Sequence, residues 1–222
     1  MRVAILGGTG DIGEGLALRW AYHTSHDLVI GSRDAQRARS KADEYESELA
    51  SRGSETSIDG AANPEAAADA DVVVAAVPAY HLVDTVEAVS EGLDSETVLV
   101  SPAVGMTRDE SGMHYNRPKA GSVTALAAGA APEGVPVVGA FHNLAADELA
   151  NLDIELSLDT LLVGDDEDAV ERVEVLADGI DGVRPLRAGP IDNAAEVESL
   201  TPLLINLAMH NEELHDVGVR FV

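Results

Sequence analysis

A glycine-rich loop near the start of the chain has the residues and the spacing of a phosphate-binding turn. Residues 8–13 read GTGDIG, which fits G-x-G-x-x-G, and they stand between an apolar run at 2–6 and an amphipathic segment at 12–22. In such a loop the first glycine, here Gly8, allows a tight turn, the second lets a pyrophosphate approach the backbone, and the third lets helix and strand pack closely. The start of the helix adds free N–H groups and a partial positive charge. The loop therefore predicts a dinucleotide site, the alternative being a glycine-rich turn without a ligand.

A cluster of arginines follows the second apolar run of the chain. An NAD site usually has Asp or Glu at this point to bind the ribose 2′-OH, whereas NADP needs a cation for its 2′-phosphate. Here the chain has Ser32 and Arg33, and Arg37 follows one helical turn later, so that both arginines can face one anion. Arg39 lies about 200° round the helix from Arg37, and we expect it to pair with Asp43 on the surface. The cluster predicts NADP rather than NAD.

Short apolar runs alternate with amphipathic segments along the whole chain. The run at 71–77 is continuously apolar and is closed by Pro78, as is typical of a buried parallel strand. Such alternation indicates β-α-β units and a doubly wound sheet. We expect strands at 2–6, 28–30, 71–77, 98–100, 135–141, 161–164 and 183–186, and helices at 12–22, 34–51, 81–89, 122–131, 167–178 and 191–210.

These elements predict a Rossmann-like, doubly wound α/β fold with a small C-terminal α/β lobe that ends in a long helix. We expect an NADP-binding Rossmann domain at 1–150 and a smaller lobe at 151–222 that closes the pocket. Residues 102–120 hold Pro, Gly, Met and Arg without a clear period and are expected to form a loop. Thr201-Pro202 should kink or restart the last helix, because proline lacks the N–H that a helix interior needs.

The chain is strongly anionic, with 40 Asp and Glu against 14 Lys and Arg and a formal net charge of −26. A surface of this sign would be repelled by phosphate backbones, which argues against nucleic-acid binding. Only two of the basic residues are lysines. An acid-rich, lysine-poor surface suits a cytoplasm at molar salt, where the Debye length falls to about 3 Å. We predict a halophilic source and an unfolding midpoint that rises from dilute buffer to molar KCl. A midpoint that is indifferent to salt would contradict this.

Two further features of the composition limit the possible chemistry and location. The chain has no cysteine, which excludes disulfides, thiolate nucleophiles and sulfur-ligated metals. Its first apolar run is too short for a signal peptide, and no later run approaches the roughly 18 apolar residues of a membrane span. We therefore expect a cytoplasmic protein without a membrane partner.

Three other groups of reactive side chains are weaker candidates. Tyr115 and Lys119 have the Y-x-x-x-K spacing of short-chain dehydrogenases, but a proline between them interrupts the helical turn that would bring them together. His210 and His215 fall on different helical faces, so a solvated helix end is favoured over a metal site, and no metal is predicted. His81 follows the end of a strand, where ligands bind in such sheets, and could touch a cofactor.

Eight stretches carry a resemblance to a known family, and they occur in order over nearly the whole chain. They are MRVAILGGTGDIGEGLALR, GSRDAQRARSKADEY, AVPAYHLVDT, VSPAV, FHNLAADELANLD, DGVRPLRAGP, VESLTPLLINL and GVRF. The chain thereby resembles the archaeal NADP oxidoreductases that use the deazaflavin coenzyme F420. This resemblance implies reversible hydride transfer between reduced F420 and NADP⁺, in which the cofactors bring the chemistry and the protein supplies stacking geometry.

The resemblance also implies which residues contact the cofactors. One set would hold the pyrophosphate, a second the 2′-phosphate, and a third would lie along the ribose and the nicotinamide. A catalytic pair would flank the nicotinamide and deazaflavin rings, the histidine either polarising an oxygen or only packing, and a C-terminal return would close over the pocket. The pyrophosphate set is Thr9, Gly10, Asp11 and Ile12, and the 2′-phosphate set is Ser32, Arg33 and Arg37. The ribose and nicotinamide set is Val77, Pro78, Ala79 and Ala146. The catalytic pair is His142 and Leu144, and the C-terminal return is Val217 and Gly218.

The chain departs from the family pattern at Ala145 and Glu148, where the family has Pro and Arg. These departures concern contacts to the acidic tail of the deazaflavin more than NADP binding. Two alternatives stay open. One is an NADPH-dependent reductase of an imine or a keto acid, which would need a proton donor, and the other is a non-catalytic NADPH-binding module. The apolar last helix is a possible surface for a homodimer or a higher homo-oligomer.

Overall fold

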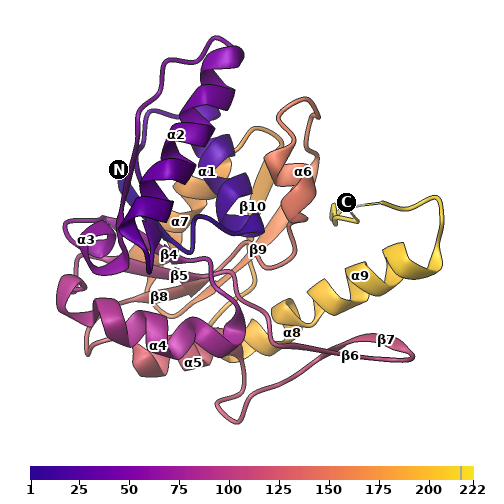
Figure 1. Ribbon diagram of the computed structural model, residues 1–222. Helices are drawn as coiled ribbons and strands as arrows, with labels where there is room; N and C mark the ends of the chain where they lie inside the picture. Colours follow the sequence, from indigo (N-terminus) through magenta and orange to yellow (C-terminus); the bar gives the residue numbers. More distant parts are fainter. Residues whose placement is uncertain (216) are drawn as a thin grey trace.

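Eight strands form one sheet in the computed structural model, which describes residues 1–215 and 217–222 (Figure 1). The strand order is β10-β9-β8-β5-β4-β1-β2-β3. Every neighbouring pair is parallel except β8 and β9, which are antiparallel. The strands are β1 (Arg2–Leu6), β2 (Asp27–Ser32), β3 (Ile58–Ala62), β4 (Val72–Ala75), β5 (Val98–Ser101), β8 (Val137–Gly139), β9 (Leu158–Gly164) and β10 (Val183–Arg187).

Helices cover both faces of the sheet, and the alternation of side chains along the strands explains why. Val3 and Ile5 of β1 pack in one core with α1, α2 and α7, whereas Ala4 and Leu6 pack in a second core with α3, α4 and α5 (Figure 1). Both faces are therefore apolar, as in other parallel sheets. The helices are α1 (Asp11–His23), α2 (Ala35–Ser51), α3 (Asn63–Ala67), α4 (Ala79–Val89), α5 (Val123–Ala130), α6 (Ala146–Ala150), α7 (Glu167–Asp178), α8 (Ala194–Glu198) and α9 (Leu200–His210).

The predicted Rossmann-like α/β fold, with a C-terminal α/β part and a long last helix, is confirmed. The C-terminal strands β9 and β10 extend the same sheet, and β9 pairs with β8 through Gly164 and Val163. The sheet is thus continuous across residue 150, and the division into domains 1–150 and 151–222 stays a prediction. Short elements that the sequence analysis did not expect include β3, α3 and α6.

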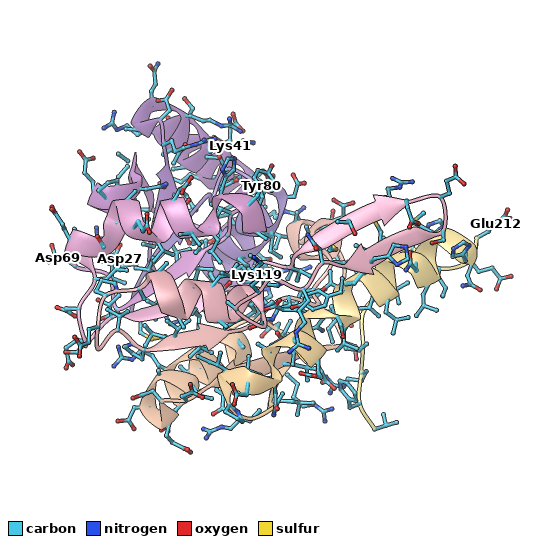
Figure 2. All side chains as sticks on the ribbon, turned by 90° about the horizontal axis from the view of Figure 1, so that it is seen from below. Asp27, Lys41, Asp69, Tyr80, Lys119 and Glu212 are labelled. Atoms are coloured by element: carbon cyan, nitrogen blue, oxygen red, sulfur yellow. The ribbon has the colours of Figure 1, made fainter. Side chains whose placement is uncertain are left out.

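Residues 102–120 do not form the expected loop. They contain an antiparallel hairpin of β6 (Met106–Asp109) and β7 (Gly112–Tyr115), which lies beside α9 and projects with it from the body (Figures 1 and 2). All four residues of β6 are exposed, so no alternation of apolar residues marked it as a strand. The hairpin is held from outside its own sequence, because the Asn206 amide accepts from Met113 N at 2.7 Å and donates to Met113 O at 2.7 Å.

The predicted interruption of the last helix is confirmed. Helix α8 ends at Glu198, and α9 starts at Leu200, which places Pro202 in the first turn of α9, where its missing N–H is tolerated. The exposed side of α9 carries Leu203 and Leu207. Of the helices that the structure describes, none combines the length and the apolar character needed to span a bilayer.

Candidate functional site

Two neighbouring cavities open at the carboxyl edge of the sheet, where ligands bind in doubly wound folds. We call the first the arginine cavity. It has a volume of about 450 Å³ and lies where β1, β2 and β4 end. It is lined by Gly7, Thr9, Gly10, Ser32, Arg33, Arg37, Asn63, Ala76, Val77, Pro78, His81, Asp84, Thr85 and Ala88.

The glycine loop forms one wall of the arginine cavity and leads into α1. Gly7 has φ +75°, and a Cβ there would lie 2.5 Å from Ala76 O, so the tight turn needs glycine one residue before the G-x-G-x-x-G pattern. A Cβ at Gly13 would lie 2.7 Å from Gly7 O, which explains the third glycine as a site of close helix packing. Helix α1 begins at Asp11 without a side-chain cap, so its first backbone N–H groups are available to an anion.

The lining of this cavity also includes two free guanidinium groups. Arg33 and Arg37 are both exposed, and neither forms an ion pair or a side-chain hydrogen bond within the part of the chain that the structure describes. The turn that carries them is fixed: Ser32 Oγ accepts from Asp34 N at 3.2 Å, and Asp34 caps α2 by accepting from Gln36 N at 2.8 Å. In a chain with 40 acidic residues, two unpaired cations on one cavity wall indicate an anionic ligand.

Arg39 lies outside this cavity, as expected, but the pair predicted for it is wrong. Arg39 and Asp43 are both within the described residues and form no ion pair there. Both side chains are exposed on α2, where an i,i+4 pair gains too little to hold one geometry. Arg39 is thus an exposed cation on the same helix as Arg37 without access to the cavity.

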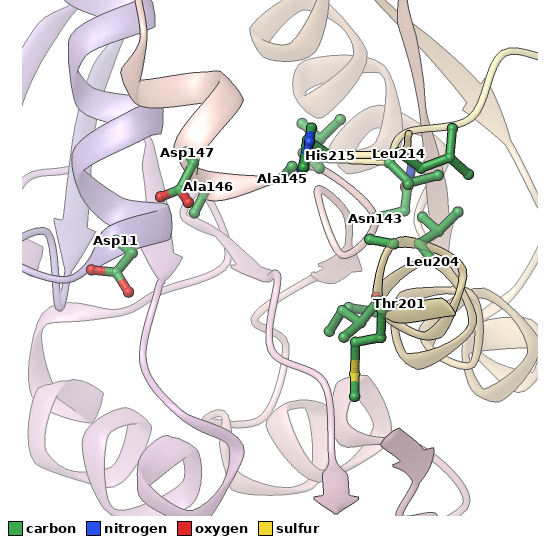
Figure 3. A pocket seen from close by; sticks show the side chains of 14 residues that line it. Asp11, Asn143, Ala145, Ala146, Asp147, Thr201, Leu204, Leu214 and His215 are labelled. Atoms are coloured by element: carbon green, nitrogen blue, oxygen red, sulfur yellow. The ribbon is translucent and has the colours of Figure 1, made fainter. Parts of the chain in front are cut away.

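The second cavity, which we call the apolar cavity, has a volume of about 630 Å³. Figure 3 shows Asp11 and Asp147 at one side of it and Thr201, Leu204 and Leu214 at the other. The last helix, the segment after β8 and the C-terminal end therefore share its walls. It is lined by Asp11, Asn143, Leu144, Ala145, Ala146, Asp147, Thr201, Leu204, Ile205, Ala208, Met209, Leu214, His215 and Val217.

The predicted site residues divide between these cavities. Thr9, Gly10, Ser32, Arg33, Arg37, Val77 and Pro78 line the arginine cavity. Asp11, Leu144, Ala146 and Val217 line the apolar cavity. The residues that line neither are Gly8, Ile12, Ala79, His142 and Gly218. The glycine loop contributes to both cavities, through Gly10 to one and Asp11 to the other, so a dinucleotide along this loop would reach from the arginines to the apolar walls.

Comparison with known proteins places this chain among enzymes of one activity. Residues 2–105 match the family described as NADP oxidoreductase, coenzyme F420-dependent. The F420-dependent NADP reductase of Methanothermobacter thermautotrophicus is 38% identical over 99% of this chain and 94% of its own, and that of Methanocaldococcus jannaschii is 36% identical over 93% and 92%. The chain belongs to the F420-dependent NADP reductase family. A solved structure from Arthrobacter sp. FB24, provisionally described as an F420-dependent NADP-reductase, has a TM-score of 0.79 at 21% identity over 100% of this chain and 99% of that one, which shows the shared fold.

In this member of the F420-dependent NADP reductase family, His142 is buried and 3% exposed. Its Nε2 lies 3.4 Å from Thr124 Oγ1, and Thr124 Oγ1 donates to Glu198 Oε1 at 3.0 Å, so the hydroxyl is left to accept from the ring. Burial lowers the pKa of His142 to about 4, and the ring is therefore neutral near pH 7. A neutral ring whose Nε2 is engaged by Thr124 favours the packing alternative over polarisation of a cofactor oxygen.

Several lining residues were missed by the sequence analysis. Asn63 lines the arginine cavity directly after β3, and its Oδ1 is buried without a hydrogen-bond partner among the described residues. Because β3 was not expected, Asn63 had no predicted place at a strand end. Asn143 stands between His142 and Leu144, and its Nδ2 donates to Asp159 O at 2.6 Å, which fixes the amide against the wall of the apolar cavity. Thr201 Oγ1 donates to His142 O at 2.7 Å and joins α9 to the same wall.

Proposed function

We propose that this chain transfers a hydride between reduced F420 and NADP⁺, with the arginine cavity holding the adenosine end of NADP and the apolar cavity enclosing the reacting rings. The observation that carries the proposal is the near full-length similarity to F420-dependent NADP reductases, at 36–38% identity. The free cations of the arginine cavity supply a place for the phosphate that distinguishes NADP from NAD. When bound, the two cofactors provide the hydride donor and acceptor themselves.

The chain contributes binding, orientation and exclusion of water. Ser32, Arg33 and Arg37 are assigned to the 2′-phosphate, and the loop from Gly8 to Ile12 to the pyrophosphate. Helix α9 and Leu144 form an apolar wall, which suits a transfer that needs aligned faces and a dry site rather than a charged base. Val77, Pro78, Ala79 and Ala146 are assigned to the ribose and nicotinamide, and Val217 to the closing side of the cavity. His142 is assigned a packing role under this wall.

One assay tests the proposed function against its rivals. Reduced F420, NADP⁺ and the protein are mixed in molar KCl, and the absorbance of both cofactors is followed. We expect oxidised F420 and NADPH to form in equal amounts. NADP binding without hydride exchange would overturn the proposal and favour the NADPH-binding module, and NADPH oxidation by imines or keto acids but not by F420 would favour the reductase of those substrates.

Assembly and location stay predictions. The exposed Leu203 and Leu207 on the projecting α9 favour a homodimer or a higher homo-oligomer, which light scattering in molar KCl would check. The cofactors as small-molecule partners follow from the proposed reaction. A cytoplasmic location agrees with two diffusible cofactors as substrates.

A further inference from the structure

The C-terminal tail, residues 217–222, lies against the first part of β9. Asp159 N donates to Val219 O at 2.8 Å, and Phe221 N donates to Asp159 Oδ2 at 2.6 Å. Strand β8 pairs with β9 only at Val163 and Gly164, so the first part of β9 has backbone groups left for the tail. The tail thus pairs with backbone groups of β9 that would otherwise have no hydrogen-bond partner in the sheet.

The carboxylate of Asp159 binds the tail at a backbone N–H, that of Phe221, and at a side chain, that of Arg220. The Asp159 side chain is fully buried, and it accepts from Arg184 Nε and Nη2 at 2.8 Å each. Arg220 of the tail reaches the same carboxylate at 3.2 Å, while Arg184 Nη2 also donates to Phe221 O at 2.6 Å. Hydrogen bonding from Arg184 holds the pKa of Asp159 below its usual range, so the carboxylate is charged at neutral pH. We call Asp159, Arg184 and Arg220 the tail clasp.

The tail clasp is joined to the apolar cavity through two of the residues that line it. Val217, at the start of the tail, lines the cavity, and the next residue, Gly218, is so close to β9 that a Cβ would lie 2.1 Å from Leu158 Cδ2. Asn143, which also lines the cavity, donates from Nδ2 to the backbone oxygen of Asp159 at 2.6 Å. Asp159 therefore fixes two lining residues of the cavity, Asn143 by a direct hydrogen bond and Val217 through the tail.

We propose that Asp159 is a positioning residue for F420: by fastening the tail through Arg184 and Arg220, it holds Val217 in place as a wall of the deazaflavin-binding cavity. This inference rests on the proposed function. The tail clasp touches no lining residue of the arginine cavity among the described contacts, and that cavity is where the proposed function places the adenosine end of NADP. Loss of the tail clasp should therefore weaken F420 binding and change NADP binding much less.

The variant Asp159→Asn tests the proposal, because it keeps the shape of the side chain and removes its charge. Arg184 and Arg220 are 44% and 42% exposed, so water can solvate them after the change and the fold should persist. The matched control is Glu174→Gln. Glu174 binds Arg187 by a similar two-bond arrangement, at 2.6 Å and 2.6 Å, between α7 and β10 and away from the tail.

Two measurements are made in molar KCl: the amide hydrogen exchange of the tail, residues 217–222, and the Kd of F420 and of NADP⁺ by equilibrium dialysis. For Asp159→Asn we expect tail exchange and the Kd of F420 to rise about tenfold each, with the Kd of NADP⁺ within about twofold, from the loss of charge-assisted hydrogen bonds. Glu174→Gln should match the unchanged protein in tail exchange, in the Kd of F420 and in the Kd of NADP⁺.

Three outcomes would overturn the proposal: a tail as protected as before, equal losses for both cofactors, or the same effects in Glu174→Gln. If Asp159→Asn does not fold, Arg220→Gln tests the proposal instead, because it removes only the ion pair that the tail makes with Asp159. Faster tail exchange together with weaker F420 binding then supports the proposal. If Arg220→Gln alters neither tail exchange nor F420 binding, the proposal is contradicted. Both readouts are independent of turnover, so absent hydride transfer in the unchanged protein would count against the proposed function and not against the tail clasp.

Discussion

The variant Arg33→Ala/Arg37→Ala is expected to raise the Kd of NADPH about a hundredfold and that of NADH less than about threefold. It removes the two arginines that we assign to the 2′-phosphate and call the clamp. Each guanidinium faces the arginine cavity without a partner among the described residues, so it is free to bind the 2′-phosphate. NADH lacks this phosphate, so its affinity should change little. The Kd values are measured by calorimetric titration, and the loss should shrink as KCl rises because the two groups are exposed and screened.

The matched control for this clamp is Arg39→Ala. Arg39 is exposed on the same helix, α2, but it does not line the cavity. Its removal changes the net charge by the same unit as removal of Arg37 alone, so it corrects for the general effect of making the protein more negative. Equal losses of NADPH and NADH in the double variant, or a loss in Arg39→Ala as large as in Arg37→Ala, would contradict the clamp.

The second large effect is expected at Glu198, which is fully buried in α8. Its carboxylate accepts four hydrogen bonds, from Tyr115 OH at 2.7 Å, Val123 N at 2.9 Å, Thr124 N at 2.9 Å and Thr124 Oγ1 at 3.0 Å. The acceptor thereby satisfies the first turn of α5, stabilises its N-terminal dipole and ties the projecting hairpin to the body. Burial, followed by the hydrogen bond to Glu198, raises the pKa of Tyr115, which therefore stays protonated as a donor.

Glu198→Ala is expected to lower the free energy of unfolding by about 3–5 kcal/mol, because it leaves several buried donors without an acceptor. Glu198→Gln should lower the free energy of unfolding by about 1–3 kcal/mol. The oxygen of its amide still accepts hydrogen bonds, but its NH₂ group faces N–H and O–H donors that it cannot accept from. The measurement is urea unfolding in molar KCl. Glu196→Gln, an exposed change in the same helix, should stay within about 0.5 kcal/mol. A Glu198→Ala protein as stable as this control would show that water replaces the carboxylate.

Much of the arginine cavity, which we assign to NADP, could be predicted from the sequence. The glycine loop, the strand before it and Arg33 with Arg37 after the next strand are local patterns, in which spacing along the chain already places side chains at one edge of a parallel sheet. The cavity then contains Thr9, Gly10 and both arginines, as the pattern indicated. The break near Pro202 was readable for a similar reason, because a proline acts on its own helix.

The apolar cavity, which we assign to the deazaflavin, could be predicted only from the family resemblance, and only in part. Leu144, Ala146 and Val217 come together with α9 although they are far apart in sequence, and no local period marks such a meeting. Asn143 stood beside predicted residues and was passed over, since its orientation depends on Asp159. His142 looked like a candidate for chemistry, and its burial above Thr124 and Glu198 depends on helices from two other parts of the chain.

From the residues alone, then, follow the parallel α/β core, a dinucleotide loop and a preference for NADP, because period, glycine spacing and charge act over a few residues. The hairpin held by Asn206, the buried Glu198, the tail fastened by Asp159 and the walls of the apolar cavity follow from folding. The first three each depend on a polar side chain that meets a partner 60 or more residues away in the sequence, at a hydrogen-bond distance that hydrophobic packing makes possible. Burial then makes those few polar contacts decisive, since an unmet group in the interior costs far more than one at the surface.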